Sequence, residues 1–203
     1  MKFGRFLLWL VRPLLYLLFP YKIKGLENVP DQDGRDLILC SNHISNLDPV
    51  FLLAGIRKRP IYYMAKAELF TNRLAVWFFE KQFGAFPVRR GKGDTGSLET
   101  AERIVREGKL MGIFPEGTRS KDGRLGRAKS GAALIAARTG ASILPVAIQA
   151  KGQRVRLFQK THIMIGKPLT PAELHLEDPE NPDLRSASRI IMEKIAKMMG
   201  DDR

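Results

Sequence analysis

One of the three histidines of this chain lies in the segment SNHISNLDPV, and an aspartate follows it five positions later. A histidine that titrates near neutral pH can remove a proton from an alcohol that attacks a carbonyl group. It does so best when its other ring nitrogen donates to a carboxylate, because this bond fixes the tautomer and stabilises the imidazolium ion. His43 and Asp48 could form such a pair. The spacing also fits a solvated loop histidine before a helix that Asp48 caps.

A nucleophile supplied by the protein would be an alternative to this pair. Cys40 lies three positions before His43, and Ser41 and Ser45 flank the histidine. Cys40, however, ends an apolar run, where a thiol is usually a small buried hydrophobic group. The chain contains no GxSxG segment, in which a sharp turn exposes a nucleophilic serine. We therefore expect a hydroxyl group of the substrate to attack directly, without a covalent enzyme intermediate.

A second candidate site is the segment FPEGTRS, which begins at Phe114 and is followed by further basic residues. Gly117 allows the backbone to turn tightly, and Thr118 offers a hydroxyl group. Arg119 can bind a phosphate group through two parallel N–H donors. These features favour an anion-binding loop, although the segment alone would also fit an exposed basic turn.

A further basic segment, VRRGKGD, also favours an anion site because it places Arg90 and Lys92 among glycines. Taken alone, it too would fit an exposed turn. Neither basic segment contains GxxxxGK followed by Ser or Thr, so a nucleotide-binding P-loop is not expected.

The elements that would position these residues alternate between strands and helices. Apolar runs predict strands at residues 37–40, 59–65, 84–90, 110–114, 141–149, 154–158 and 161–169. Helical spacing and caps predict helices at residues 48–56, 72–83, 94–109, 127–140 and 184–198. This order favours a single layered α/β domain, with a central, largely buried mixed sheet flanked by helices. His43 and the FPEGTRS segment each follow a strand directly, at the ends where reactive loops of such folds gather.

The first 20 residues form a separate apolar segment. Its hydrophobic run, residues 6–19, is too short to span a bilayer and is interrupted by Arg12 and Pro13. It lacks the small-residue cleavage site of a secretory signal. Aromatic and leucine side chains beside Lys and Arg suit a helical segment that lies in the lipid headgroup layer. We expect residues 1–20 to associate with a membrane and residues 21–203 to form the main domain; a kinked core helix is the alternative.

The charge of the chain favours a polyanionic partner. Lys and Arg total 34 against 21 Asp and Glu, which gives a formal net charge of +13. Such an excess suits nucleic acid, an anionic bilayer, or an acidic protein or substrate. Aromatic residues gather in apolar runs instead of alternating with the basic clusters, which argues against nucleic acid. The single cysteine excludes an internal disulfide, and no spacing of Cys or His residues predicts a metal site.

Four blocks in order, SNHxSxxDP, GAFPVRR, FPEGTRS and SILPVAI, resemble the glycerolipid acyltransferase family and its bacterial 1-acyl-glycerol-3-phosphate (lysophosphatidic acid) acyltransferases. The resemblance covers roughly residues 20–170. It implies that His43 is the general base and Asp48 its partner. It also implies that substrate-binding residues are Glu116, Gly117, Thr118, Arg119 and Arg90, to which we add Lys92 from its charge and position.

The resemblance further implies the reaction. A fatty acyl group would pass from acyl-CoA or acyl carrier protein to the sn-2 hydroxyl of 1-acyl-glycerol-3-phosphate, giving phosphatidic acid without a cofactor. The expected partners are lysophosphatidic acid, the acyl donor and an anionic membrane surface, with the protein on the cytoplasmic face of the cell membrane. The alternatives are acylation of glycerol 3-phosphate or another lyso-lipid, or a non-catalytic binder of anionic membranes or nucleic acid.

Overall fold

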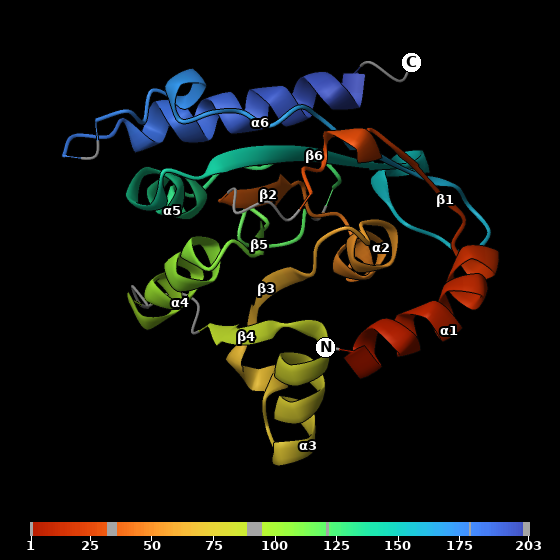
Figure 1. Cartoon of the computed structure of the whole chain (residues 1–203). Coiled ribbons are helices and arrows are strands. Elements are labelled where there is room, and N and C mark those ends of the chain that lie inside the picture. The colour runs from red at the N-terminus through yellow and green to blue at the C-terminus, as the bar shows by residue number, and fades with distance from the viewer. Residues whose placement is uncertain (1, 32–35, 89–94, 121, 179, 201–203) are drawn as a thin grey trace.

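The computed structural model describes residues 2–31, 36–88, 95–120, 122–178 and 180–200. In these residues one seven-stranded sheet has the order β1-β7-β6-β2-β5-β3-β4 (Figure 1). The strands are β1 (Tyr21–Lys24), β2 (Leu37–Ser41), β3 (Ile61–Lys66), β4 (Ala85–Val88), β5 (Leu110–Ile113), β6 (Ser142–Ala150) and β7 (Thr161–Ile165). Neighbouring strands are parallel except β6 and β7, which are antiparallel. The predicted mixed sheet is confirmed.

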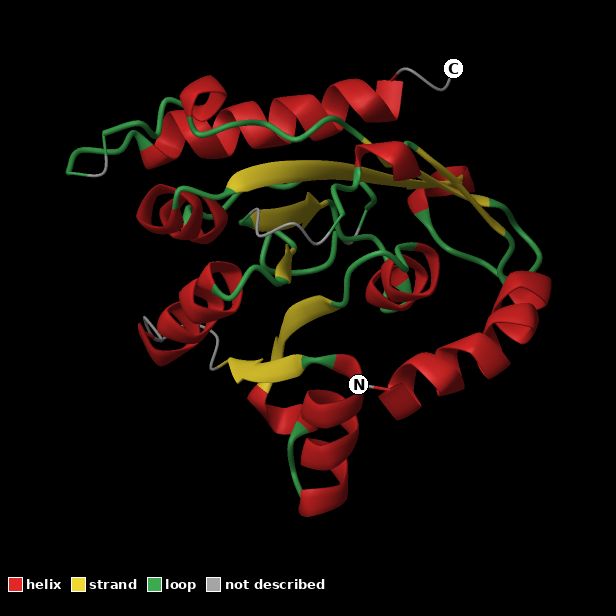
Figure 2. Cartoon of the chain, in the orientation of Figure 1, coloured by secondary structure: helices red, strands yellow, loops and turns green. Residues whose placement is uncertain are grey.

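Helices cover both faces of this sheet (Figure 2). The helices are α1 (Lys2–Leu18), α2 (Asp48–Gly55), α3 (Arg73–Val76), α4 (Thr95–Arg106), α5 (Gly131–Thr139) and α6 (Leu184–Gly200). Shorter helical segments are η1 (Leu26–Asn28), η2 (Ala67–Leu69), the π-helical η3 (Trp77–Gln82), η4 (Lys151–Gln153) and η5 (Ala172–Leu174). One core packs α4, α5 and α6 against the sheet, and the other core packs α1 and α2 against the opposite face.

The central strands are apolar along their whole length because both of their faces are covered. Every residue of β2 is buried, including Ser41 at its end. Such continuous burial is expected where helices pack on both sides of parallel strands. The strand β2 lies between β5 and β6, so the loop that follows it leaves from the middle of the sheet.

Several predicted elements differ from the structure. The helix predicted at residues 72–83 is the short α3 followed by the π-helical η3, and the strand predicted at residues 161–169 ends at Ile165. Residues 154–158 form a loop, so the strand predicted there is wrong: the Phe158 N–H donates to the Leu18 carbonyl at the end of α1, at 2.7 Å, and not to a strand. The predicted helix 127–140 begins only at Gly131, because the Lys129 N–H is used to bond the Pro115 carbonyl, at 2.8 Å. The edge strand β1 was not predicted, because lysines occupy two of its four positions and its apolar pattern is weak.

The N-terminal segment is a surface helix, which excludes the kinked core helix considered above. The helix α1 continues through Pro13 and buries Leu15 against the core that contains α2. No helix in the described part of the chain has the length and apolarity to cross a bilayer. The outward side of α1 instead exposes large apolar side chains, namely Phe3, Phe6, Trp9, Leu10, Val11, Leu14, Tyr16 and Leu17.

Candidate active site

Two loops that follow the neighbouring strands β2 and β5 are bonded together at the carboxyl ends of these strands. Cys40 of β2 pairs with Ile113 of β5 in parallel register, so the loops after them start side by side. The Ser120 N–H then donates to the His43 carbonyl, at 2.8 Å. The structure therefore brings the histidine loop and the FPEGTRS loop together, as the sequence predicts.

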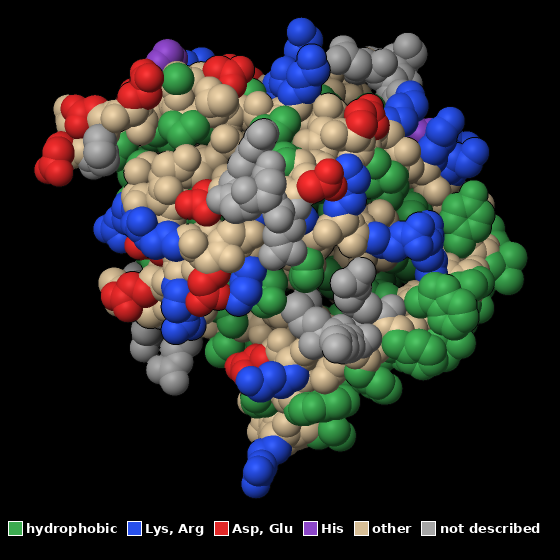
Figure 3. Space-filling model, in the orientation of Figure 1, with side chains coloured by type: hydrophobic (Ala, Val, Ile, Leu, Met, Phe, Trp, Pro, Cys, Tyr) green, Lys and Arg blue, Asp and Glu red, His purple; other side chains and the backbone are tan. Residues whose placement is uncertain are grey.

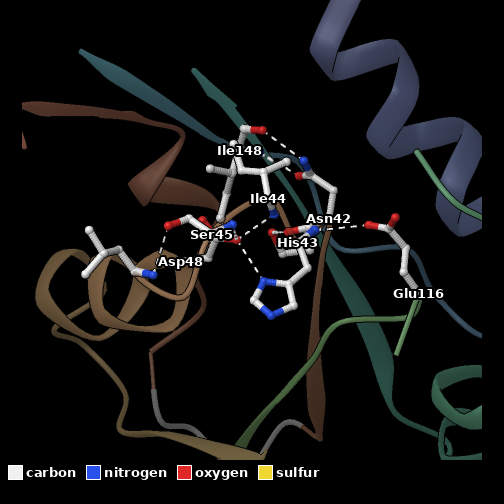
Figure 4. Close-up of polar contacts among 9 residues, drawn as sticks. Asn42, His43, Ile44, Ser45, Asp48, Glu116 and Ile148 are labelled. Carbon is white, nitrogen blue, oxygen red and sulfur yellow. Dashed lines mark hydrogen bonds and ion pairs between the residues drawn. The ribbon is translucent and has the colours of Figure 1, made fainter. Parts of the chain in front are cut away.

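The His43 ring is hydrogen-bonded to Asp48. His43 Nδ1 lies 2.8 Å from Asp48 Oδ2, and the same oxygen accepts from the N–H groups of Ile44 and Ser45, each at 2.7 Å (Figure 4). Asp48 is fully buried, and α2 is capped by Leu47 without a side-chain bond. The alternative of a solvated histidine beside an N-cap aspartate is therefore wrong. Asp48 is the first helical residue and its carboxylate turns back to organise the loop.

These hydrogen bonds determine which nitrogen of the neutral His43 ring carries the proton. Two backbone N–H groups already donate to Asp48 Oδ2, so that oxygen acts as an acceptor and His43 Nδ1 acts as the donor. The unprotonated nitrogen of the neutral ring is then Nε2, which points away from Asp48 (Figure 4). The His43 side chain is 13% exposed. Nε2 is thus the ring atom placed to accept a proton from a bound hydroxyl group.

Aromatic stacking holds one face of the histidine ring. The rings of His43 and Phe114 are stacked with their centroids 4.1 Å apart and an angle of 19° between their planes. Phe114 in turn stacks on Tyr63, at 5.8 Å and 11°. A Cβ at Gly112 would lie 2.3 Å from the Tyr63 ring, so the glycine makes room for this stack. Sequence reasoning missed it, because nothing in the chain marks Tyr63 as a neighbour of the FPEGTRS segment.

A buried asparagine anchors the start of the histidine loop. The Asn42 amide group donates to the Ile148 carbonyl at 2.9 Å, and its oxygen accepts from the Ile148 N–H at 2.7 Å. Asn42 is almost fully buried, so these paired bonds satisfy groups that water cannot reach. They fix the peptide before His43 to strand β6. An asparagine directly after a buried strand is the only signal for it in the sequence.

Glu116 joins the two loops. One of its carboxylate oxygens accepts from the His43 N–H at 3.0 Å, and the other accepts from the Gly126 N–H at 2.8 Å. The Glu116 side chain is buried. With both oxygens bonded to backbone groups, it holds the loop that carries the histidine against the loop that carries Arg119. Binding of substrate by Glu116 itself stays a prediction.

The anion-binding residues predicted in the FPEGTRS segment lie beside the histidine loop. Thr118 and Arg119 are exposed, and the peptide of Ser120 bonds to the His43 carbonyl. Gly117 has a left-handed backbone with φ of 71°, and a Cβ there would approach the Lys129 side chain to about 3.0 Å. Lys129 is therefore another cation at this loop.

The remaining predicted anion-binding residues, Arg90 and Lys92, lie outside the described residues, and their roles stay predictions. In the described part of the chain, the Arg119 guanidinium group makes no hydrogen bond or ion pair, so its donors face solvent. An exposed, unpaired guanidinium group is suited to take up a phosphate group from solution.

Burial makes the nearby thiol and phenol unreactive. Cys40 is fully buried, and burial raises the pKa of its thiol far above the usual value. Because the thiolate is the nucleophilic form, this cysteine is unsuited to attack an acyl group. Burial, and then the charge of Asp48, raise the pKa of Tyr63, which keeps its phenol neutral. Neither group is available as a nucleophile or a base beside His43.

The described site combines a histidine–carboxylate pair with an adjacent loop that carries the exposed Arg119. The family model described as Acyltransferase matches residues 20–149. The chain belongs to the acyltransferase family. A relative from Bacillus subtilis (strain 168), 1-acyl-sn-glycerol-3-phosphate acyltransferase, is 33% identical to this acyltransferase over 192 residues, which span 93% of the chain and 92% of the relative.

Two further comparisons agree. The chloroplastic 1-acyl-sn-glycerol-3-phosphate acyltransferase LPAT1 from Arabidopsis thaliana is 33% identical over 141 residues, which span 68% of this acyltransferase and 38% of the relative. The crystal structure of the 1-acyl-sn-glycerophosphate acyltransferase PlsC from Thermotoga maritima superimposes with a TM-score of 0.73 at 23% identity. The superposition covers 100% of this chain and 83% of the PlsC chain, which shows that the two proteins share a fold.

Replacing Glu116 with glutamine tests whether this residue positions the loops. A glutamine side chain has one acceptor oxygen and one NH₂ group, so either the His43 or the Gly126 N–H loses its acceptor. We expect a loss of about 1–3 kcal/mol in the free energy of unfolding together with a lower kcat. Thermal or urea unfolding and steady-state kinetics measure these effects. A variant of unchanged stability with only a raised acceptor KM would assign Glu116 to substrate binding instead.

Proposed function

We propose that this acyltransferase moves a fatty acyl group from an acyl thioester to the sn-2 hydroxyl of 1-acyl-sn-glycerol-3-phosphate, giving phosphatidic acid. The relatives that carry this name support the reaction, and the Bacillus subtilis relative is matched over nearly its whole length. The observation that carries the mechanism is the oriented pair of His43 and Asp48, with Nε2 directed away from the carboxylate beside the Arg119 loop.

In the proposed mechanism, His43 is the general base. Its Nε2 takes the proton from the sn-2 hydroxyl group while the hydroxyl oxygen attacks the carbonyl carbon of the thioester. An ester bond forms as the carbon–sulfur bond breaks, and the proton passes from the imidazolium ion to the departing thiolate. Asp48 stabilises the charged ring in between. General-base catalysis of this kind is typically worth about 10²- to 10⁴-fold in rate.

The phosphate group of the acceptor binds the basic loop. Arg119 supplies two parallel donors, and Gly117 and Thr118 let the backbone and a hydroxyl group approach the same anion. Arg90 and Lys92 add charge to this site. Holding the headgroup here brings the free hydroxyl against His43, and such positioning can contribute as much as the base itself.

The acyl donor is a thioester of coenzyme A or of acyl carrier protein, and no cofactor is needed. The protein works as a peripheral or monotopic protein on the cytoplasmic face of the cell membrane, where its lipid acceptor resides. Residues 1–20 attach the acyltransferase domain, residues 21–203, to the bilayer. The outward apolar side of α1 and the net charge of +13 support this attachment.

The reaction is tested by following thioester consumption with purified acceptors. We expect transfer to 1-acyl-sn-glycerol-3-phosphate to exceed transfer to glycerol 3-phosphate and to a lyso-lipid whose phosphate is covered by a further headgroup. Mass spectrometry of the lipid product would show phosphatidic acid. A faster reaction with glycerol 3-phosphate would assign the protein to the first acylation step instead.

The Arg119 loop gives a specific prediction on affinity. Replacing Arg119 with alanine removes charged hydrogen bonds to the phosphate group and should raise the acceptor KM about tenfold or more, with a smaller change in kcat. Arg189→Ala is a matched control, because it removes one charge from an arginine that pairs with Glu193 on α6. An acceptor KM that Arg119→Ala leaves at the control value would refute the phosphate contact.

A further inference from the structure

The exposed apolar surface of α1 continues beyond the helix on both sides. Next to one end lie Leu74 and Trp77, from α3 and η3, and next to the other lie Leu157 and Phe158, from the loop after η4. All four side chains are large and exposed. We call these residues and the exposed side of α1 the outer apolar surface. Figure 3 shows hydrophobic side chains gathered over α1, with Lys and Arg side chains beside its C-terminal end.

Specific contacts tie the three segments of this surface together. At the start of α1, Phe3 packs on Trp77 with ring centroids 5.8 Å apart, and the Gly4 N–H donates to the Gln82 side chain at 3.0 Å. At the other end, the Phe158 N–H donates to the Leu18 carbonyl at 2.7 Å. Segments far apart in the sequence are thus held together around α1.

Phe158 combines high exposure of an aromatic side chain with an unfavourable backbone conformation. Its side chain is 69% exposed, and its backbone has φ of 59°, in the left-handed region. A bulky residue with positive φ is strained, and glycine would adopt this conformation without penalty. Its one bond to α1 uses only the backbone. The aromatic ring therefore adds strain and exposure without a described benefit to the fold, which points to a partner outside the chain.

The charges around this loop identify the partner. Arg154, Arg156 and Lys160 flank the two apolar residues and are exposed, as is Lys22 on the adjacent β1. Aromatic and aliphatic side chains bordered by Lys and Arg fit an anionic bilayer, where the rings enter the headgroup layer and the cations bind lipid phosphates. A second copy of a chain with a net charge of +13 would be repelled by the same cations.

We infer that the bilayer contact is a composite surface in which the loop 154–160 and the α3–η3 segment insert beside α1. This rests on the proposed function, because that function places the acceptor in a lipid layer. In this proposal the loop 154–160 and Trp77 bind the membrane together with the N-terminal residues 1–20.

The two tryptophans of the chain report directly on this surface. Trp9 lies on α1 and is 63% exposed, and Trp77 lies on η3 and is 43% exposed. In the single-tryptophan variants Trp77→Phe and Trp9→Phe, we expect vesicles of phosphatidylglycerol to shift the fluorescence to the blue. Lipids brominated near the headgroup should quench both. Quenching of Trp9 without quenching of Trp77 would show that α1 binds alone and would overturn the composite surface.

Replacing Phe158 with glycine separates membrane binding from folding. Glycine relieves the strained backbone and keeps the bond to Leu18, so the melting temperature should be unchanged or higher. Loss of the ring should weaken partitioning onto phosphatidylglycerol vesicles by about tenfold. His175→Gly is the matched control: His175 has φ of 55° and is exposed, but it follows η5 on the opposite face of the sheet.

Vesicle co-sedimentation of these variants decides the inference. Binding of Phe158→Gly at the level of His175→Gly would overturn the role of the loop. A lipid-free dimer that Phe158→Gly dissociates in sedimentation velocity would assign the surface to a second copy and overturn the bilayer. Transfer to a soluble short-chain acceptor should be equal in both variants. If the proposed function were wrong, the wild-type protein would lack this transfer while its vesicle binding still responded to Phe158→Gly.

Discussion

Replacing His43 with alanine is expected to abolish detectable acyl transfer while leaving the protein folded. A general base typically contributes about 10²- to 10⁴-fold in rate. No described group beside His43 can take over this proposed role, because Cys40 and Tyr63 are buried and stay protonated. Asp48 keeps two N–H donors, from Ile44 and Ser45, so its carboxylate is not left without partners.

The measurement is a thioester-consumption assay with lysophosphatidic acid, supported by circular dichroism and thermal unfolding. The acceptor KM, or its affinity measured directly, should change little, since the phosphate group binds elsewhere. His175→Ala serves as a control histidine outside the site. Transfer by His43→Ala at more than a tenth of the wild-type rate would contradict its role as the base.

Replacing Asp48 with asparagine is expected to lower kcat by about 100-fold, with a smaller loss of stability than Asp48→Ala. The N–H groups of Ile44 and Ser45 both point at one oxygen, so they select the amide orientation that puts the asparagine oxygen there. His43 Nδ1 then keeps its acceptor and the correct tautomer, and the variant removes mainly the negative charge that stabilises the imidazolium ion.

Asp48→Ala is the contrasting variant. It leaves two backbone N–H groups and the His43 ring without an acceptor, and each buried orphan costs about 1–3 kcal/mol. We expect lower stability as well as lower kcat, measured by urea unfolding and steady-state kinetics. If Asp48→Asn were as unstable as Asp48→Ala, this would contradict the hydrogen bonds described from Ile44 and Ser45 to one oxygen of residue 48. Wild-type kcat in Asp48→Asn would show that the charge is not needed.

The meeting of His43 with the FPEGTRS segment could be predicted, because both follow strands of one predicted sheet and such loops share an edge. The sequence could not predict which groups hold them there. Glu116 bonds His43 across 73 positions, and Asn42 bonds Ile148 across 106 positions. These contacts depend on strand order, and no local pattern along the chain encodes that order.

In the loop 154–160 a local sequence pattern led to a wrong prediction of a strand. The residues RVRLF alternate as in a half-buried strand, but the N–H of Phe158 is taken by the end of α1. An alternating pattern indicates only that apolar and polar side chains point to opposite sides of the backbone. Here Val155 packs against the core while Leu157 and Phe158 are exposed, and tertiary contacts decide the backbone path.

The bond from Ser120 to the His43 carbonyl joins the loop proposed to bind the headgroup to the loop of the proposed base. Arg119 precedes Ser120 in the chain, so any redesign of residues 117–120 for a different headgroup also shifts the peptide that carries the imidazole. Engineering a new acceptor preference into this scaffold therefore requires compensating changes in both loops at once. Substitutions confined to one loop would yield proteins that bind the new lipid but acylate it slowly.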